Sequence, residues 1–247
     1  MLSLPVMSTY VDLHCHWIAG IDDGARTPDE GIQMLRALKS IGFCEVVATP
    51  HMRPGMFDNE RADLVGAFER MQPLLAEHAD LPTVGLSSEH YFDSTVFDRV
   101  LADQALPYPG QRAILLEFYP LAFPLHIEQR LADIRRRKLL PVIAHPERYQ
   151  SVWKQPEILE RLVDLGAAAL LDAAALDGKY GRQPKRCARD LLERGLYHAA
   201  CSDAHRPADV APVVQGMSWI AKEYGQEEVD FLFREGPRAI LAGELPT

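Results

Sequence analysis

Short apolar runs recur along the chain at intervals that leave room for one helix between each pair. The runs are a few residues long, partly β-branched and bounded by Gly, Pro or charged residues, which is typical of buried parallel strands. They span residues 10–13, 45–49, 83–86, 113–116, 140–144, 168–171 and 198–201. Seven such runs alternating with helical segments indicate an α/β protein built from a parallel βα array.

Amphipathic segments fill the intervals between these runs. The first has a capping residue, Thr27, followed by Pro28 and by Glu30 in the capping-box position. A helix should therefore start there and run to about Ser40, with Gly42 ending it. Further helices are expected near residues 60–79, 94–103, 125–138, 156–165, 183–194, 209–224 and 227–241. No Pro-rich or Ser-rich linker divides the array, so we expect one barrel-like domain over all 247 residues rather than an open doubly wound sheet.

Charge and hydropathy restrict the partners and the location. The formal net charge is −9 at pH 7 and the pI is near 5.5. An acidic surface repels a phosphate backbone, so no binding to nucleic acid is expected. No apolar run reaches the ~18 residues of a membrane span. The uncharged start, residues 1–7, lacks the basic region of a signal peptide. We therefore expect a cytoplasmic protein that does not insert into a membrane.

The cysteines do not suggest disulfides or cysteine chemistry. They are Cys15, Cys44, Cys187 and Cys201. None belongs to a C-x-x-C pair, so we expect reduced and mostly buried thiols. A cysteine-dependent tyrosine phosphatase needs an arginine six residues after its nucleophile, to hold the phosphate. The residues at that spacing are Ile21, Pro50, Glu193 and Pro207, which excludes this class.

Metal-capable side chains follow nearly every predicted strand. They are His14, His16, His51, Glu89, His90, Glu117, His145, Glu147, Asp172, Asp203 and His205. In βα barrels the active site lies at the C-terminal ends of the strands, so side chains at these positions should converge. Three other histidines lie within or near predicted elements and are not expected to bind metal: His78, His126 and His198.

The spacing within these groups fits metal binding. Alternate side chains of a strand share a face, so His14 and His16 point together while Cys15 points away. Asp203 and His205 repeat this alternation. A mixture of imidazoles and carboxylates suits zinc, manganese or iron and is too rich in nitrogen for calcium. The set exceeds what one ion can use, so the sequence predicts a site for several ions.

A sum of charges indicates the substrate class. The carboxylates available to the site are Asp23, Glu89, Glu117 and Asp203. About three divalent ions would outweigh their four negative charges and leave a positive pocket, to which Arg148 would add. Such a pocket favours an anionic phosphoester.

Several of these pieces occur together in a known family. His14-Cys15-His16 followed by Gly20-Ile21-Asp22-Asp23-Gly24 resembles the opening D-x-H-x-H…D-D-G of the PHP-superfamily branch that contains bacterial protein tyrosine phosphatases of the CpsB/YwqE type. The later pieces that agree are Ala48-Thr49-Pro50-His51, the Glu89 region, Glu117, His145-Pro146-Glu147-Arg148-Tyr149, Gly178-Lys179-Tyr180-Gly181 and Ser202-Asp203-Ala204-His205. The resemblance runs from about Tyr10 to Gly243.

The resemblance implies a fold and a metal centre. The fold would be a distorted, seven-stranded TIM-like βα barrel of the PHP type. The centre would be trinuclear, with manganese as the expected ion and iron or zinc as alternatives. The resemblance assigns one ion to His14, His16 and Asp203, a second, bridged by Glu89, to Glu117 and His145, and a third to Asp23, His51 and His205.

The resemblance also implies the reaction. Arg148 would bind the substrate phosphate, and Arg148, Asp203 and His51 are the candidate catalytic residues. A metal-activated hydroxide would attack phosphorus in line, without a covalent phosphoenzyme. The substrates would be phosphotyrosine proteins, and in this family they are bacterial tyrosine kinases that control capsule or exopolysaccharide export. Self-association of the chain is left open.

The chain departs from the family pattern at three places. Met52 follows His51 where a second histidine is common, and His90 follows Glu89 near a position where the family often has arginine. Arg206 directly follows the D-A-H segment, where the family usually has asparagine. Because the metal set is complete, hydrolysis should survive. His90 and Arg206 are the candidate replacements for a missing phosphate contact.

Three rival functions share parts of this pattern. A PHP phosphatase for a small phosphomonoester, such as histidinol phosphate, would use the same metal chemistry. A regulator that binds metal and docks onto a kinase would need no reaction, but the complete ligand set argues against it. A nuclease or proofreading module is disfavoured by the acidic charge and by the lack of basic patches interleaved with aromatic residues.

Overall fold

Parallel strands form the centre of the molecule. The structure, a computed structural model, describes residues 9–246, so the segment 1–7, expected to be no signal peptide, lies outside the described residues. The strands are β1 (Tyr10–Cys15), β2 (Phe43–Ala48), β3 (His51–Met52), β4 (Thr83–Leu86), β5 (Glu89–Tyr91), β6 (Ala113–Glu117), β7 (Leu140–Ala144), β8 (Ala168–Asp172) and β9 (Ala199–Cys201). Every pairing between them is parallel, in the orders β1-β2-β4 and β3-β5-β6-β7-β8-β9.

The two sheets are parts of one distorted barrel. β2 and β3 follow each other along one line, interrupted at Thr49 and Pro50, and β4 and β5 are interrupted at Ser87 and Ser88. Pro50 has no N–H to donate to a ladder, so its strand cannot continue unbroken. If β2 with β3 and β4 with β5 are each counted as one interrupted strand, the described part of the chain has seven barrel strands. The expected seven-stranded α/β barrel is therefore confirmed. The runs at 83–86 and 140–144 match β4 and β7, and the two short segments β3 and β5 were not expected.

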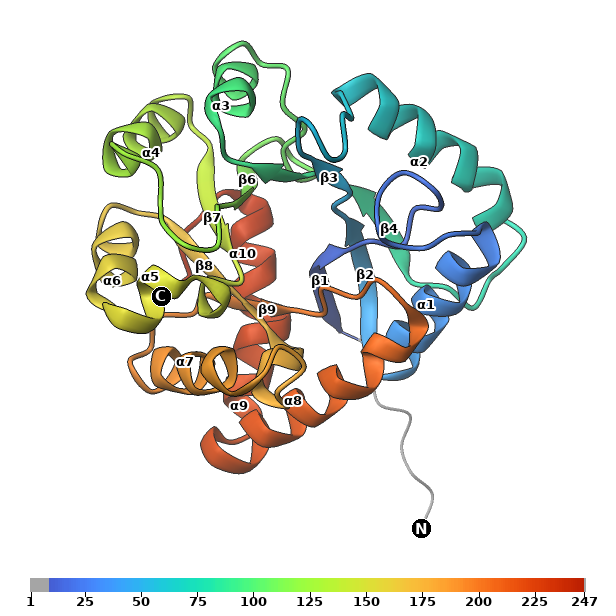
Figure 1. The fold of residues 1–247 in the computed structure, drawn as a ribbon. Coiled ribbons are helices and arrows are strands. Elements are labelled where there is room, and N and C mark those ends of the chain that lie inside the picture. Colours follow the sequence, from blue (N-terminus) through green and yellow to red (C-terminus); the bar gives the residue numbers. More distant parts are fainter. Residues whose placement is uncertain (1–8, 247) are drawn as a thin grey trace.

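Helices surround the strands as a ring (Figure 1). They are α1 (Pro28–Ser40), α2 (Arg61–Leu75), α3 (Ser94–Leu101), α4 (Ile127–Arg136), α5 (Gln150–Lys154), α6 (Glu157–Asp164), α7 (Arg182–Glu193), α8 (Val210–Tyr224), α9 (Gln226–Asp230) and α10 (Gly236–Ala242). Among the described residues, none of these helices is both long and apolar enough to cross a bilayer. Short 3-10 turns follow β7, β8 and β9.

Two details of the helices differ from expectation. Thr27 caps α1, since its hydroxyl accepts from Glu30 N at 3.3 Å, but the Glu30 side chain accepts from Arg26 N at 2.8 Å and does not close a capping box on Thr27. The expected helix at 227–241 is divided into α9, a π-helical turn (Phe231–Glu235) and α10. Pro237 cannot donate a helical hydrogen bond, which explains why the ladder widens just before it.

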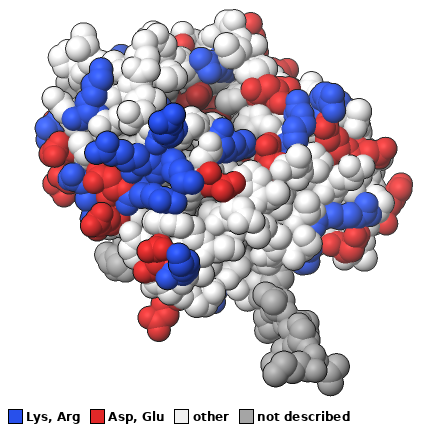
Figure 2. Space-filling model, turned by 60° about the horizontal axis from the view of Figure 1, so that its bottom comes forward, with Lys and Arg blue, Asp and Glu red and all other residues white. Residues whose placement is uncertain are grey.

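The core lies in two layers, because side chains of each strand alternate in direction. One layer fills the barrel and takes residues such as Leu115, Val142 and Leu170, while their neighbours pack under the helices. Ile240 of α10 belongs to the inner layer, so this helix closes the end of the barrel opposite the C-terminal strand ends; it lies behind the strands in Figure 1. The surface is mixed in charge, and Lys and Arg lie beside Asp and Glu on the face in Figure 2.

The first and last strands meet and close the barrel. Cys15 pairs with Ala204 as an isolated parallel bridge. Asp12, fully buried, accepts from Ser202 N at 3.0 Å, from the Ser202 hydroxyl at 2.5 Å and from His14 N at 3.3 Å. Burial raises the pKa of Asp12 to about 6, while the bonds from Ser202 act in the opposite direction.

Removal of the Asp12 carboxylate should weaken this closure. Asp12→Ala leaves the backbone N–H groups of Ser202 and His14 without this partner, while the Ser202 hydroxyl keeps His14 O as an acceptor at 3.3 Å. Buried unpaired donors cost about 1–3 kcal/mol each, so we expect the free energy of unfolding to fall by about 2–4 kcal/mol. Ser202→Ala removes the bonds of the hydroxyl to Asp12 Oδ2 and His14 O and its bond from Ala204 N, and should cost less, about 1–2 kcal/mol. Urea unfolding of both variants measures the two losses of unfolding free energy. Equal losses would show that the Asp12 carboxylate is not the main contact that closes the barrel.

Candidate metal centre

The nine residues expected to bind metal lie together at the C-terminal strand ends. They are His14, His16, Asp23, His51, Glu89, Glu117, His145, Asp203 and His205, and their ligand atoms fall into four overlapping groups, each within 4.8 Å. His14, His16, Glu89, His145 and Asp203 are all at least 96% buried. The outcome follows from topology, because parallel strands deliver their C-terminal ends to one rim.

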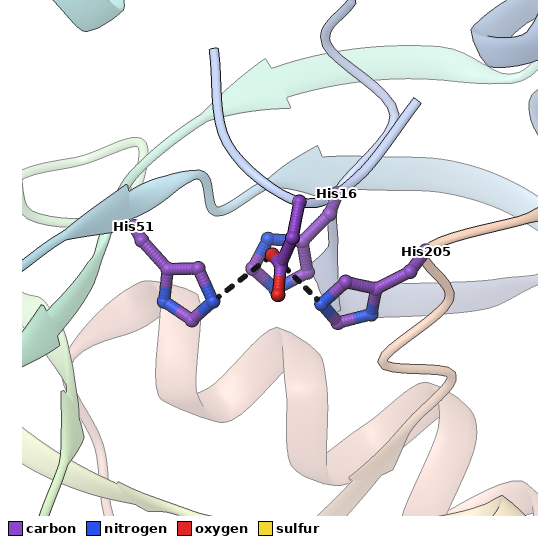
Figure 3. Close-up of side chains that lie close together, drawn as sticks. His16, His51 and His205 are labelled. Carbon is purple, nitrogen blue, oxygen red and sulfur yellow. Dashed lines mark ion pairs between the residues drawn. The ribbon is translucent and has the colours of Figure 1, made fainter. Parts of the chain in front are cut away.

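The outer group consists of His16, Asp23, His51 and His205. The Asp23 carboxylate lies between two imidazoles, with Oδ1 at 3.4 Å from Nε2 of both His51 and His205 (Figure 3). The rings of His16 and His205 stack with centroids 4.1 Å apart. Hydrogen bonds from His205 and His51 lower the pKa of Asp23 well below its usual range.

Glu89 is the centre of the inner groups. Its Oε2 lies 3.3 Å from His14 Nε2 and 3.0 Å from His51 Nδ1, and its Oε1 lies 2.8 Å from His145 Nε2. His14 Nε2 and His16 Nε2 are 3.1 Å apart and both face this carboxylate. Burial opposes ionisation of Glu89, but the charges of His14 and His51 hold its pKa well below the usual range.

The observed grouping differs in part from the one that the resemblance implied. The ring of His16 approaches the outer group as well as His14 and Glu89. Glu117 groups with His51 and Glu89, and His145 groups with His14 and Asp203. His14, His16, His51 and Glu89 therefore each belong to two groups, so neighbouring groups share residues.

Several buried polar atoms of this set have no hydrogen-bond partner among the described residues and are suited to bind cations. Atoms without a hydrogen-bond partner in the described part of the chain include Glu117 Oε2, Asp203 Oδ1 and the Nδ1 atoms of His14, His51 and His145. Burial and the nearby Glu89 charge raise the pKa of Glu117 to about 7. Buried polar atoms are normally paired, and imidazoles and carboxylates together are ligands for manganese, iron or zinc.

Asp22 supports the centre and was not anticipated. Its Oδ2 lies 2.8 Å from His16 Nδ1 and accepts from His51 N at 3.1 Å, while Oδ1 accepts from Gly24 N at 2.9 Å. A carboxylate on the far nitrogen of a ligand imidazole fixes its orientation and raises its basicity. The sequence signal was the pair Asp22-Asp23, which alone is indistinguishable from a turn.

Arg148 enters the site beside Asp203. Its Nη2 donates to Asp203 Oδ2 and lies 3.6 Å from Asp172 Oδ2, and its guanidinium lies 4.4 Å from the centroid of the Tyr180 ring. Burial opposes its charge, yet the carboxylates, Asp203 first among them, keep the pKa of Arg148 well above its usual range. Tyr180 and Asp172 thus position the Arg148 guanidinium. The sequence motif Gly178–Gly181 contains Tyr180, but the sequence alone did not indicate that Tyr180 contacts Arg148.

Arg206 contacts the protein rather than an open phosphate site. Its Nη1 donates to Asp23 O at 2.9 Å, to Gly24 O and to His205 O at 2.7 Å, and its Nε lies 3.7 Å from Glu30 Oε1. The guanidinium therefore joins the loop of Asp23 to the segment of His205, two residues of the outer group. The expectation that Arg206 replaces a phosphate contact is wrong in this geometry.

The expectation that His90 binds phosphate is also wrong. The His90 ring is fully buried, with Nδ1 at 2.9 Å from Leu115 O and Nε2 accepting from Leu106 N at 3.1 Å. Both nitrogens are used by backbone groups, so the ring holds the loop before β6 and is not available to a substrate. Burial lowers the pKa of His90 to about 4, which keeps the ring neutral.

His90 should make the fold sensitive to acid. Its pKa is about 4 in the folded state, below the usual histidine value of 6.5, so the unfolded chain binds more protons between these values. Its stabilising effect is complete above pH 6.5 and is lost as pH falls through 4, by about 1.4 kcal/mol per pH unit. His90→Gln should flatten this slope in urea unfolding of chelator-treated protein at pH 7, 6 and 5. An unchanged slope would contradict the assignment.

The other histidines and the cysteines lie apart from the centre. His198 Nδ1 accepts from Ala169 N at 3.1 Å, and His78 faces Arg36 on the surface. His126 precedes α4 as its N-cap residue and does not lie inside the helix as expected. All four cysteines are free and three are buried, as expected, with Cys44 partly exposed.

A family model matches the chain over residues 10–242, and its description is "Capsular polysaccharide synthesis, CpsB/CapC". Among curated proteins, the tyrosine-protein phosphatase YwqE of Bacillus subtilis is 31% identical over 236 residues, covering 95% of this chain and 92% of that protein. The tyrosine-protein phosphatase CpsB of Streptococcus pneumoniae is 27% identical over 241 residues, covering 95% and 99%.

Solved structures agree on the fold. A chain described with the crystal structures of YwqE from Bacillus subtilis and CpsB from Streptococcus pneumoniae, "unique metal-dependent tyrosine phosphatases", superposes with a TM-score of 0.88 at 29% identity and covers 96% of both chains. A lactonase from Listeria monocytogenes matches with a TM-score of 0.56 at 10% identity, covering 98% and 97%, which shows a shared barrel alone.

Proposed function

Because this chain belongs to the CpsB/CapC family of capsular polysaccharide synthesis proteins, we propose that it is a metal-dependent phosphatase that hydrolyses phosphotyrosine in proteins. The observation that carries the proposal is the mostly buried set of four overlapping ligand groups beside the cationic Arg148. YwqE and CpsB, which the chain matches over 92% and 99% of their lengths, are tyrosine phosphatases, and the superposed structure is described as that of a metal-dependent one.

The nine strand-end residues would hold three divalent ions. Manganese is the proposed ion, and iron and zinc fit the same mixture of nitrogen and oxygen ligands. Glu89, which faces three imidazoles, and His51, which belongs to two groups, would be among the residues that hold them. Bound ions would lower the pKa of water and neutralise phosphoryl oxygens.

The protein's own groups set the position of the phosphate. Arg148 is held over the centre by Asp203, Asp172 and the face of Tyr180, so its remaining donors can pair with phosphate oxygens. Asp203 orients Arg148 from one oxygen while the other lies 3.2 Å from His14 Nε2. Asp22 fixes the His16 ring, and Arg206 holds the Asp23 loop against the His205 segment. We propose that the physiological substrate is a bacterial tyrosine kinase that controls capsule or exopolysaccharide synthesis.

Removal of the metal by chelation, followed by addition of single metals, tests both the metal dependence of the reaction and the choice of substrate. After chelation, hydrolysis of a phosphotyrosine peptide should fall at least about tenfold, and manganese, iron or zinc added singly should restore it to different extents. The restored enzyme is then compared on the peptide and on histidinol phosphate. A clear preference for histidinol phosphate would overturn the substrate proposal, and full activity after verified metal removal would overturn the metal role.

A further inference from the structure

Large apolar side chains are exposed beside the metal centre. Among the described residues, the most exposed are Leu125 at 83%, Met56 at 60%, Tyr119 at 53% and Leu121 at 50%. All four lie in loops that leave strand ends carrying candidate ligands: Met56 follows β3 with His51, and the other three follow β6 with Glu117. We call Met56, Tyr119, Leu121 and Leu125 the apolar rim.

The two loops are joined at the mouth of the site. Arg53, in the loop of Met56, lies 3.8 Å from Glu117 and its guanidinium lies 4.2 Å from the centroid of the Tyr91 ring. Phe57 stacks on His51 with centroids 5.1 Å apart and planes at 5°. Through Arg53 and Phe57, the loop that carries Met56 therefore contacts Glu117 and His51, two of the candidate ligands.

The loop after β6 is held in place from below. Phe118 and Phe123 pack on the Tyr149 ring with centroid distances of 6.0 and 5.3 Å and on each other at 5.0 Å. Gln150 N donates to Pro120 O at 2.8 Å. Tyr149 directly follows Arg148, so the same segment that supplies the phosphate-binding cation anchors this loop. The exposed apolar side chains thus belong to a loop that is held in place by packing. Their exposure to water is unfavourable in free energy, and contact with a partner would remove this penalty.

We propose that the apolar rim binds apolar side chains that flank phosphotyrosine in a protein substrate. The proposal rests on the proposed function, because a phosphate held at Arg148 brings the residues on either side of its tyrosine over the loops that border the site. A protein substrate is the occupant that explains why the exposed apolar residues gather at this mouth. A second copy of the chain or a lipid surface would not require proximity to Arg148.

Paired variants and peptides test the apolar rim. The variant is Leu121→Ser/Leu125→Ser, and its matched control is Leu74→Ser/Leu165→Ser, two leucines exposed at 36% and 46% in α2 and after α6. Substrates are a phosphotyrosine peptide with leucines on both sides, the same peptide with serines, and p-nitrophenyl phosphate as the reference without flanking residues. In the rim variant, kcat/KM for the leucine peptide relative to the reference should fall about fivefold or more, with little change in the control.

Several results would overturn the proposal. One is an equal ratio of leucine peptide to reference in the wild type and the rim variant. Another is an equal loss on all three substrates, which would give the loop a purely structural role. A change confined to oligomeric state or to binding of phosphatidylcholine vesicles would assign the rim to a second copy or to a membrane. If the wild type hydrolyses neither peptide but hydrolyses a small phosphomonoester, the proposed function itself fails.

Discussion

Asp203→Asn should abolish most of the phosphatase activity, lowering kcat for a phosphotyrosine peptide by more than about a thousandfold. One Asp203 oxygen pairs with Arg148, and the other lies 3.2 Å from His14 Nε2 within a candidate ligand group. The amide carries no charge and is a poor ligand for a divalent ion. It would therefore weaken the metal site and release the guanidinium together.

Metal analysis separates the two effects of this variant. The metal content of purified protein should fall by at least one ion per chain, and excess metal should not restore full activity. Asp190→Asn is the matched control, because Asp190 is partly exposed and pairs with Arg194 on α7. Full phosphate release by Asp203→Asn would show that the site assignment is wrong.

Arg148→Ala should lower kcat/KM by about a hundredfold to a thousandfold without emptying the metal centre. The partly buried guanidinium is a fixed positive charge, and its pKa lies well above the usual range because of Asp203 and its other anionic neighbours. Its effect should therefore not vary with pH over the working range. Arg148→Lys should recover part of the loss, because lysine keeps the charge but not the planar pair of donors.

The control for this variant is Arg194→Ala. Arg194 lies at the end of α7, pairs with Asp190 and Glu160 on the surface, and should be nearly neutral in activity. Titration of inorganic phosphate as an inhibitor adds a direct readout, since the inhibition constant should rise in Arg148→Ala. An unchanged inhibition constant together with unchanged kcat/KM would exclude Arg148 from phosphate binding.

The alternation of strand residues made most of the centre predictable. His14 and His16 share a face and Cys15 turns away, as the two-residue period requires, and the sequence could place these ligands because the C-terminal ends of parallel strands meet. The same rule accounts for the error at His90. Glu89 faces the centre, so its neighbour His90 on β5 must face the other way. Because β5 is only three residues long, the sequence did not predict it as a strand, and this alternation was missed.

Partners that are set by loop conformation could not be predicted. Asp22 and Asp23 are adjacent carboxylates, yet one supports His16 from outside the centre and the other stands between two imidazoles. Arg206 looked free because its partners are backbone carbonyls some 180 residues away, which leave no mark on composition or spacing. The division of the ligands among ions likewise depends on distances of a few tenths of an ångström.

The bridge between Cys15 and Ala204 determines at which stage of folding the whole centre can form. His14 and Asp203 lie on opposite sides of that closure, so a chain in which β9 has not yet formed has seven of the nine candidate ligands and lacks Asp203 and His205. Contacts across such long sequence separations form late, because the entropy of closing the loop must be met first. The two groups that contain Asp203 or His205 can therefore form only after the barrel has closed, so the whole centre exists only in the closed barrel.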